Sequence, residues 1–265
     1  MSETGLTVYG PEVGKSGLTA SLDEFIRRET GLEIAERFLS IHSRVSIESF
    51  YSLTGSTGGK HWPLVLDLFD TRPAYATIWS GPNALQHLQR LKGNTQPARA
   101  AVGTIRSRFF CDNAVTNLIH VSDSLNIMDL ELDILRRRHV GGNQDGWASL
   151  SSGFVSHSSL RVLLAILGGH DGYDMHCVCG DDTAVTNALW AIDRAEALAA
   201  GRSLSVTLQA YFAGEQNSVD DLIKSGSGNG ISAWDRLLLQ AGLHAMGHWL
   251  SLRERALARQ AGADR

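Results

Sequence analysis

The chain has 265 residues, of which 43% are hydrophobic and 20% are charged, and its formal net charge is −4. These values are typical of a folded protein with one large or two ordinary domains, and they argue against intrinsic disorder and against a nucleic-acid partner. The absence of a long apolar run or signal-peptide pattern and the presence of only three cysteines favour a cytoplasmic protein with no membrane partner.

Short runs of β-forming residues alternate with helical patterns over residues 5–135. Strands are expected at 6–9, 34–40, 74–79 and 118–121, and helices are expected to begin near residues 18, 46, 83 and 125. This order predicts a ferredoxin-like βαββαβ domain of the α/β (α+β) class. The long segment between residues 91 and 118 contains Gly93, Pro97 and Gly103, and we expect it to be a structureless binding loop.

The composition changes after residue 138. The basic run Arg136–His139 meets the glycine-rich stretch Gly141–Gly146, which we interpret as a helix C-terminus followed by a linker. We therefore expect two domains, at residues 1–138 and 139–265, the second being mostly helical. Its helices are expected at 160–167, 183–200, 219–224 and 234–258, and a short strand is expected at 203–211.

Four ordered blocks carry the chemistry of the first half. The segment Asn117–Ser124 reads Asn-Leu-Ile-His-Val-Ser-Asp-Ser, which resembles the Asn-x-x-His-Gly-Ser-Asp-Ser signature of nucleoside diphosphate kinases. Blocks that begin at Trp79, Gly93 and Gly103 resemble three further blocks of this family in order and spacing. Four ordered blocks are far more specific than one short motif. Over residues 5–135 the chain is thus similar to nucleoside diphosphate kinases.

The resemblance implies a phosphotransferase in which His120 takes a phosphoryl group from a nucleoside triphosphate and passes it to a nucleoside diphosphate, with Mg²⁺ bound to the nucleotide. A neutral imidazole is nucleophilic near pH 7 when its second nitrogen is held in one tautomer. By resemblance Glu131, eleven residues later, holds that nitrogen, so His120 and Glu131 are the expected catalytic pair. Family members are symmetric oligomers, so a homo-oligomer is also expected.

Other residues are implied around the nucleotide. By resemblance, Tyr51 supports the histidine, Trp62 or His61 offers a planar face to the base, Thr95 and Arg106 contact phosphate, and Asn117 bonds the sugar. Those assignments, with the family arginine position occupied by Gln89, give the expected nucleotide-binding set: Tyr51, His61, Trp62, Gln89, Thr95, Arg106 and Asn117.

Two departures affect the phosphate ligands that the resemblance implies. The family's Lys-Pro-Asp appears as Gly10-Pro11-Glu12, and its helix arginine is replaced by Gln89. Each lost charge-assisted contact costs about 10² in rate or affinity. A slow kinase or a specialised acceptor is therefore expected. The alternative is a nucleotide-binding or nucleotide-sensing module that no longer transfers phosphate and has a helical interaction domain.

Other segments are weaker signals. Gly10–Ser16 resembles a P-loop but has three residues between its glycines instead of four, so it is interpreted as a strand-to-helix turn. Lys15 is either a solvated lysine or a substitute for the missing one. His170–Asp182 is expected to be a turn-rich loop, and His244 and His248 to be packing neighbours on one helix, so no metal ligand is assigned. A separate metal-dependent activity of the second half stays open.

Overall fold

The computed structural model describes residues 3–141, 155–168, 184–225 and 231–263. They form two compact units, each assembled from several segments of the chain. The first unit draws on Met1–Asn94, Gly103–Arg106 and Val115–His157. The second draws on Thr95–Val102, Ser107–Ala114 and Ser158–Arg265.

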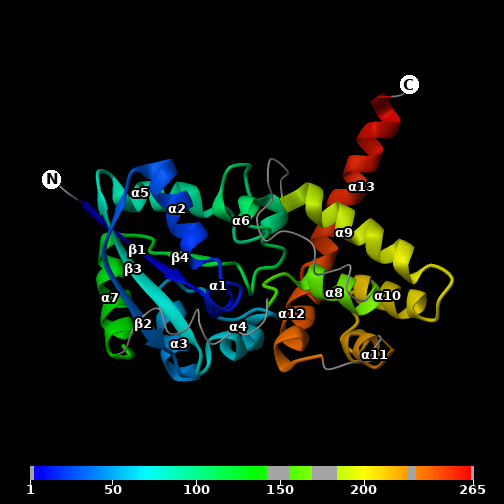
Figure 1. Ribbon diagram of the computed structural model, residues 1–265, viewed down its shortest axis with the longest axis horizontal. Coiled ribbons are helices and arrows are strands. Elements are labelled where there is room, and N and C mark those ends of the chain that lie inside the picture. Colours follow the sequence, from blue (N-terminus) through cyan, green and yellow to red (C-terminus); the bar gives the residue numbers. More distant parts are fainter. Residues whose placement is uncertain (1–2, 142–154, 169–183, 226–230, 264–265) are drawn as a thin grey trace. The chain divides into compact units, whose positions relative to one another are not determined.

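The first unit contains an antiparallel sheet with the strand order β2-β3-β1-β4 (Figure 1). Its strands are β1 Glu3–Tyr9, β2 Glu33–Ile41, β3 Pro73–Gly81 and β4 Ile119–Val121. Its helices are α1 Pro11–Lys15, α2 Thr19–Thr30, α3 Arg44–Ser52, α4 Trp62–Phe69, α5 Ala84–Lys92 and α7 Leu125–Arg136. The predicted ferredoxin-like βαββαβ order is confirmed, with α2 and α5 as the two crossover helices.

Different helices cover the two faces of this sheet (Figure 1). On one face the hydroxyl of Tyr9 donates to Asp23 of α2, and Gly5 lies directly against α5. Side chains alternate along a strand, so Val8 points to the opposite face together with His120, its cross-strand partner. Helices α3 and α7 contact each other on that side. The strand register therefore decides that His120 faces α3 and α7.

The segment between α5 and β4 is not the structureless loop that we expected. It contains the 3-10 turn η1 Pro97–Arg99 and the short helix α6 Ile105–Arg108. Ile105 and Arg106 are buried, and the Arg106 side chain ties this helix to both ends of the segment through Gly93 and Asn117. A buried, hydrogen-bonded arginine fixes a segment in a way that composition does not reveal.

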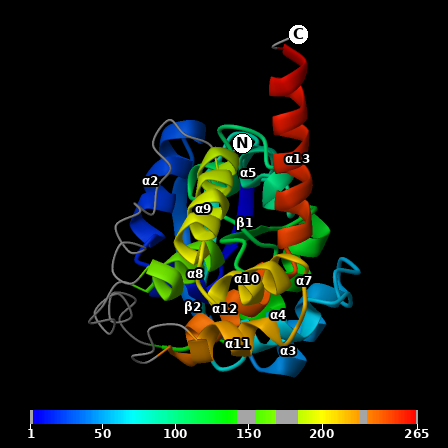
Figure 2. The same ribbon diagram turned by 90° about the vertical axis from the view of Figure 1, so that its right-hand side faces the viewer.

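The described part of the second unit is helical (Figure 2). Its longer helices are α8 Ser159–Gly168, α9 Ala184–Ala199, α10 Leu204–Phe212, α11 Ser218–Ser225, α12 Ala233–Leu243 and α13 Met246–Ala263. The strand predicted at 203–211 is wrong, because this segment is α10. Leu204, Leu208 and Phe212 recur every four residues and are buried, so helical packing outweighed the β-forming residues between them.

The helix predicted at 234–258 is divided between α12 and α13, with His244 and Ala245 in the break. His244 and His248, which we expected to be neighbours on one helix, therefore do not share one, and His248 is exposed on α13. Gly242 approaches α8 so closely that a Cβ atom there would lie 2.3 Å from the Ser159 hydroxyl. In both views α13 extends beyond the other helices of its unit (Figures 1 and 2).

Asp112 explains why residues 107–114 belong to the second unit. Its Oδ2 accepts hydrogen bonds from the hydroxyls of Ser158 and Ser159 and from the amide of Leu160, at 2.6, 3.0 and 2.8 Å. Its backbone carbonyl accepts a bond from the indole of Trp249. A buried carboxylate at a helix N-terminus is well placed, because the free amides there need acceptors.

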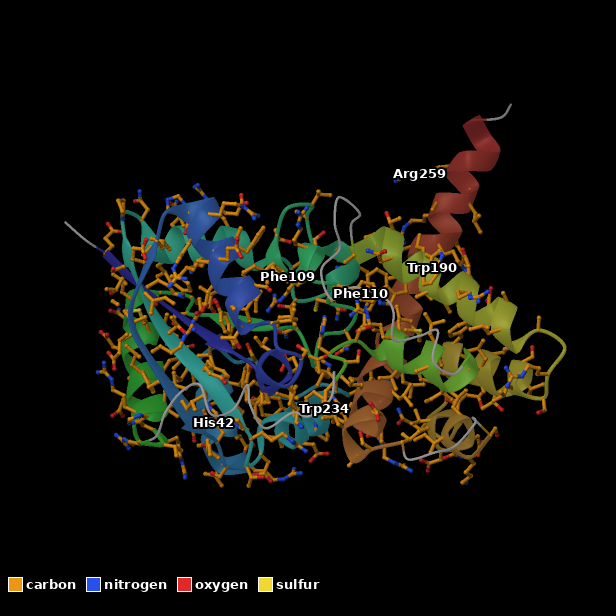
Figure 3. The ribbon with its side chains drawn as sticks, viewed as in Figure 1. His42, Phe109, Phe110, Trp190, Trp234 and Arg259 are labelled. Atoms are coloured by element: carbon orange, nitrogen blue, oxygen red, sulfur yellow. The ribbon has the colours of Figure 1, made fainter. Side chains whose placement is uncertain are left out.

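The guanidinium of Arg161 lies over the ring of Phe110, which Figure 3 labels beside Phe109. Residues 107–114 therefore pack with the second unit, although they precede β4 in sequence.

The domain boundary after residue 138 stays a prediction. Residues 170–182, with their metal-capable side chains, lie outside the described residues. No described helix is long and apolar enough to cross a membrane.

Candidate functional site

His120 lies on the edge strand β4, and a carboxylate from the following helix holds its imidazole. Nε2 of His120 is 2.8 Å from Oε1 of Glu131, and the hydroxyl of Ser122 donates to Oε2 of the same carboxylate. Glu131 has no exposed side-chain surface, whereas 17% of the His120 side chain is exposed. Because a carboxylate accepts, Nε2 carries the hydrogen and Nδ1 keeps its lone pair. Nδ1 has no hydrogen-bond partner among the described residues.

Helix periodicity brings Glu131 to this position. Ser124 caps α7 by accepting a hydrogen bond from the amide of Ile127, which sets the start of the helix. The buried face of α7 then consists of Met128, Glu131, Leu132 and Leu135. A carboxylate in an apolar stripe requires partners, and His120 and Ser122 supply two donors. Glu131 is therefore part of the site although its helix face is otherwise core.

Aromatic rings from α3 contact the imidazole, and rings from α4 contact Tyr51 in turn. The rings of Phe50 and Tyr51 meet His120 edge-on at centroid distances of 5.0 and 6.0 Å. Tyr51 in turn meets Trp62 at 5.7 Å, and His61 precedes Trp62 as the N-cap residue of α4. Burial, and then the charge of Glu12, raise the pKa of Tyr51, so its hydroxyl stays protonated and able to donate. The structure thus places one predicted residue, Tyr51, against the histidine, and a second, Trp62, against Tyr51.

His42, which Figure 3 labels just after β2, belongs to the packing behind these rings. It is buried and meets Phe50 and Phe69 edge-on, and its Nδ1 lies 3.1 Å from the Ser46 hydroxyl. Burial, with a smaller effect of the Arg138 charge, lowers the pKa of His42 to about 4. His42 therefore stays neutral and buried at neutral pH, which leaves His120 as the partly exposed histidine of this cluster.

Arg106 and Asn117 form one buried hydrogen-bonded group. The guanidinium of Arg106 donates to the backbone carbonyls of Gly93, Asn117 and Ile119 and to the side-chain oxygen of Asn117, at 2.7 to 3.1 Å. An arginine has five N–H donors, and these four bonds use most of them. Arg106 therefore holds the backbone on both sides of the site and contributes positive charge to it. Phosphate contact by Arg106 stays a prediction.

Gln89 and Thr95 lie differently from the other predicted residues. The amide nitrogen of Gln89 donates to the backbone carbonyls of Ser122 and Asp123 at 2.9 and 2.8 Å. Gln89 therefore anchors the turn after β4 to α5. Thr95 is exposed and belongs to the second unit. Nucleotide contact by these two residues stays a prediction.

A buried carboxyl group stands where the resemblance implies a lysine. Oε1 of Glu12 accepts a hydrogen bond from the amide of Leu118 at 2.8 Å, whereas its Oε2 is buried without a partner. A Cβ atom on Gly10 would collide with that Oε2, so a side chain at position 10 would require the Glu12 carboxyl to move. In this structure the buried carboxyl of Glu12 lies beside the position where the resemblance implies a lysine. The loss of the lysine is visible in the sequence, whereas the burial of the Glu12 carboxyl is visible only in the structure.

Burial is the main cause of an unusual pKa at Glu12. It raises this pKa from 4.5 to about 7, against the lowering effects of the hydrogen bonds from its own amide and from Leu118 and of the Arg106 charge. Because the pKa of Glu12 is higher in the folded than in the unfolded state, its contribution to the free energy of unfolding is largest at a pH where the group is protonated in both states. That contribution is lost as the pH rises from 4.5 to about 7. The loss amounts to about 3 kcal/mol.

Glu12→Gln is expected to remove this pH dependence while still accepting the Leu118 amide. The melting temperature of the variant should rise relative to the natural chain as the pH increases from 4.5 to 7, because only the natural chain must bury a group that prefers to ionise. Thermal unfolding at several pH values measures the difference. Glu24→Gln, an exposed change on α2, is the matched control. Parallel curves for the natural chain and Glu12→Gln would contradict the expectation.

Three further residues of the site were not predicted as site residues. Ser122 stands within the signature motif, so its spacing from His120 was the available signal. Phe50 and Lys92 carry no motif, and only their tertiary positions reveal them. Lys92 is the last residue of α5, where its charge interacts with those of Arg106, Asp123 and Glu131.

The structure defines a ferredoxin-like protein with a carboxylate-held histidine on the edge strand of its sheet. The sequence profile of the nucleoside diphosphate kinase family matches residues 4–139. The chain therefore belongs to the nucleoside diphosphate kinase family, and the family and fold support a function like that of these kinases. Residues 140–265 lie outside the matched range.

The chain is similar to the following two relatives and one solved structure. The chain is 33% identical to a nucleoside diphosphate kinase of Ehrlichia canis over 48% of this chain and 86% of that protein. It is 33% identical to a nucleoside diphosphate kinase of Wolinella succinogenes over 49% of this chain and 92% of that protein. The solved structure of a nucleoside diphosphate kinase from Halobacterium salinarum in complex with CDP is 22% identical, covers 56% of this chain and 99% of that chain, and has a TM-score of 0.43.

Proposed function

We propose that the chain transfers a phosphoryl group from a nucleoside triphosphate to a second acceptor through a phosphohistidine on His120. The observation that carries this proposal is the pairing of Nε2 with the buried carboxylate of Glu131 at 2.8 Å, while Nδ1 has no hydrogen-bond partner in the described chain. A histidine held in one tautomer with its other nitrogen available is equipped for nucleophilic catalysis.

The proposed reaction has two displacements at phosphorus. In the first, the Nδ1 lone pair forms the N–P bond as the bond from the γ-phosphorus to the bridging oxygen breaks, and the nucleoside diphosphate leaves with that oxygen. In the second, an acceptor oxygen forms a bond to phosphorus and the N–P bond breaks, which restores neutral His120. The Nε2–H group keeps donating its hydrogen bond to the Glu131 carboxylate throughout, and the carboxylate stabilises positive charge on the ring.

Mg²⁺ would enter with the nucleotide. Among the described residues, His, Cys, Asp and Glu side chains do not gather into a group of three that could hold a metal ion. Mg²⁺ commonly keeps several waters and binds substrate phosphates with one or two carboxylates, so this site fits a metal that arrives on its substrate. When bound, the ion neutralises phosphate charge.

Tyr51, Trp62 and His61 would contact the nucleotide, and Asn117 would form a hydrogen bond with its sugar.

The acceptor is proposed to be a nucleoside diphosphate or a more specialised nucleotide. Gly10 and Gln89 replace two cations that the resemblance implies, and the Arg106 donors are used within the protein. Both features reduce the positive charge available to a polyphosphate. A less highly charged acceptor would tolerate this reduction better.

The cytoplasmic location, the homo-oligomeric state and the separate role of the second half stay predictions.

The test is to incubate the natural chain with γ-labelled ATP and Mg²⁺ and to map the label. We expect acid-labile, base-stable label on the peptide that contains His120, and chase with a panel of nucleotides should remove it and identify the acceptor. Label on another residue, or none at any Mg²⁺ concentration, would overturn the proposal.

A nucleotide-binding module without transfer is the second candidate, and the engagement of Arg106 and Gln89 with backbone carbonyls favours it. It predicts that nucleotides raise the melting temperature of the chain while no phosphohistidine forms. The same preparation can be used for both measurements, so binding and transfer are separated directly.

A further inference from the structure

Lys92 lies between two anchors that fix the end of α5 beside the site. Gln89, three residues earlier and on the same side of the helix, bonds the backbone of Ser122 and Asp123. Gly93, the next residue, accepts a hydrogen bond from Nη1 of Arg106 at 2.9 Å. The helix end that carries Lys92 is therefore held against both the turn that follows His120 and the buried arginine.

The charge of Lys92 is partly buried and is not paired within the described chain. Its ammonium makes no hydrogen bond or ion pair there, and its side chain is half-buried. Burial and the positive charge of Arg106 lower the pKa of Lys92, whereas the charges of Asp123 and Glu131 raise it. A partly desolvated cation without a counter-ion is costly, and a bound anion would offset that cost.

We propose that Lys92 binds the oxygens of the terminal phosphate of the incoming nucleotide. Three observations support this role: the fixed helix end, the unpaired ammonium, and the engagement of Arg106 with four protein oxygens. Lysine binds phosphate as a point charge, so it needs no fixed fork geometry and can act from a helix end. The effect on transfer rests on the proposed function, whereas the binding of polyphosphate does not.

Lys92→Met tests the proposal because it keeps the length of the side chain and removes the charge. Binding of Mg²⁺–ATP and of inorganic tripolyphosphate, measured by calorimetry, should weaken about 10²-fold, since one charge-assisted phosphate contact is lost. Binding of adenosine should not change. Lys92→Arg should retain most of the affinity, and a melting temperature at least as high as that of the natural chain would show that Lys92→Met is folded.

Arg90→Met is the matched control. Arg90 lies on the same helix, two residues earlier and exposed, and it carries the same charge. The Arg90→Met variant should bind tripolyphosphate with the same affinity as the natural chain. Equal affinities for Lys92→Met and Arg90→Met would overturn the role of Lys92, even if His120 is labelled normally. If Lys92→Met loses tripolyphosphate binding while the natural chain forms no phosphohistidine, Lys92 stands as a phosphate ligand and the proposed transfer fails.

Discussion

Replacing His120 by alanine is expected to abolish the acid-labile label from γ-labelled ATP. The variant lacks the Nδ1 lone pair that forms the N–P bond, and His42 stays buried behind the aromatic rings. The rise in melting temperature caused by nucleotide should persist, because the proposed phosphate and base contacts lie on other residues. Labelling and thermal unfolding of the same samples measure both effects.

His87→Ala controls for the loss of a histidine elsewhere, since His87 lies on α5 and is only half-buried. It should be labelled like the natural chain. His120→Asn provides a second test, because asparagine keeps a polar partner for the buried Glu131 carboxylate if alanine impairs folding. Persistent label in folded His120→Ala or His120→Asn would show that the phosphate is carried elsewhere.

Glu131→Gln is expected to slow the labelling of His120 about 10²-fold, because the carboxylate no longer stabilises positive charge on the imidazole. Glutamine still accepts a hydrogen bond from Nε2 or from Ser122, so the fold should be retained. Nucleotide affinity should stay unchanged, because Glu131 acts through His120 as a positioning residue. Single-turnover labelling at saturating ATP gives the rate, and calorimetry gives the affinity.

Asp133→Asn is the matched change on the same helix. Asp133 is exposed and pairs with Arg137 four residues later, so this variant should be labelled at the natural rate. Glu131→Asp should recover part of the rate by restoring the charge on a shorter side chain. A labelling rate for Glu131→Gln within about twofold of the natural chain would be too small for a lost charge-assisted bond, and it would remove Glu131 from the mechanism.

Much of the first unit could be predicted because its signals are local. The order of strands and helices follows from hydrophobic periods of two and 3.6 residues, and those periods survive in a single sequence. The eleven-residue spacing between His120 and Glu131 spans one strand end, one turn and two helical turns. With Ser124 as the cap, that spacing directs the carboxylate to the imidazole.

Long-range contacts decided the rest. The sequence alone determined the βαββαβ domain, and its resemblance to nucleoside diphosphate kinases implied the pair of His120 and Glu131, which adjacent elements position. Only the tertiary structure showed that the Glu12 carboxyl fills the space beside Gly10, that Arg106 bonds protein oxygens, and that Lys92 ends a helix anchored at the site. Such contacts depend on which surfaces compete for burial and for hydrogen bonds after the chain has folded, and sequence spacing does not encode that competition.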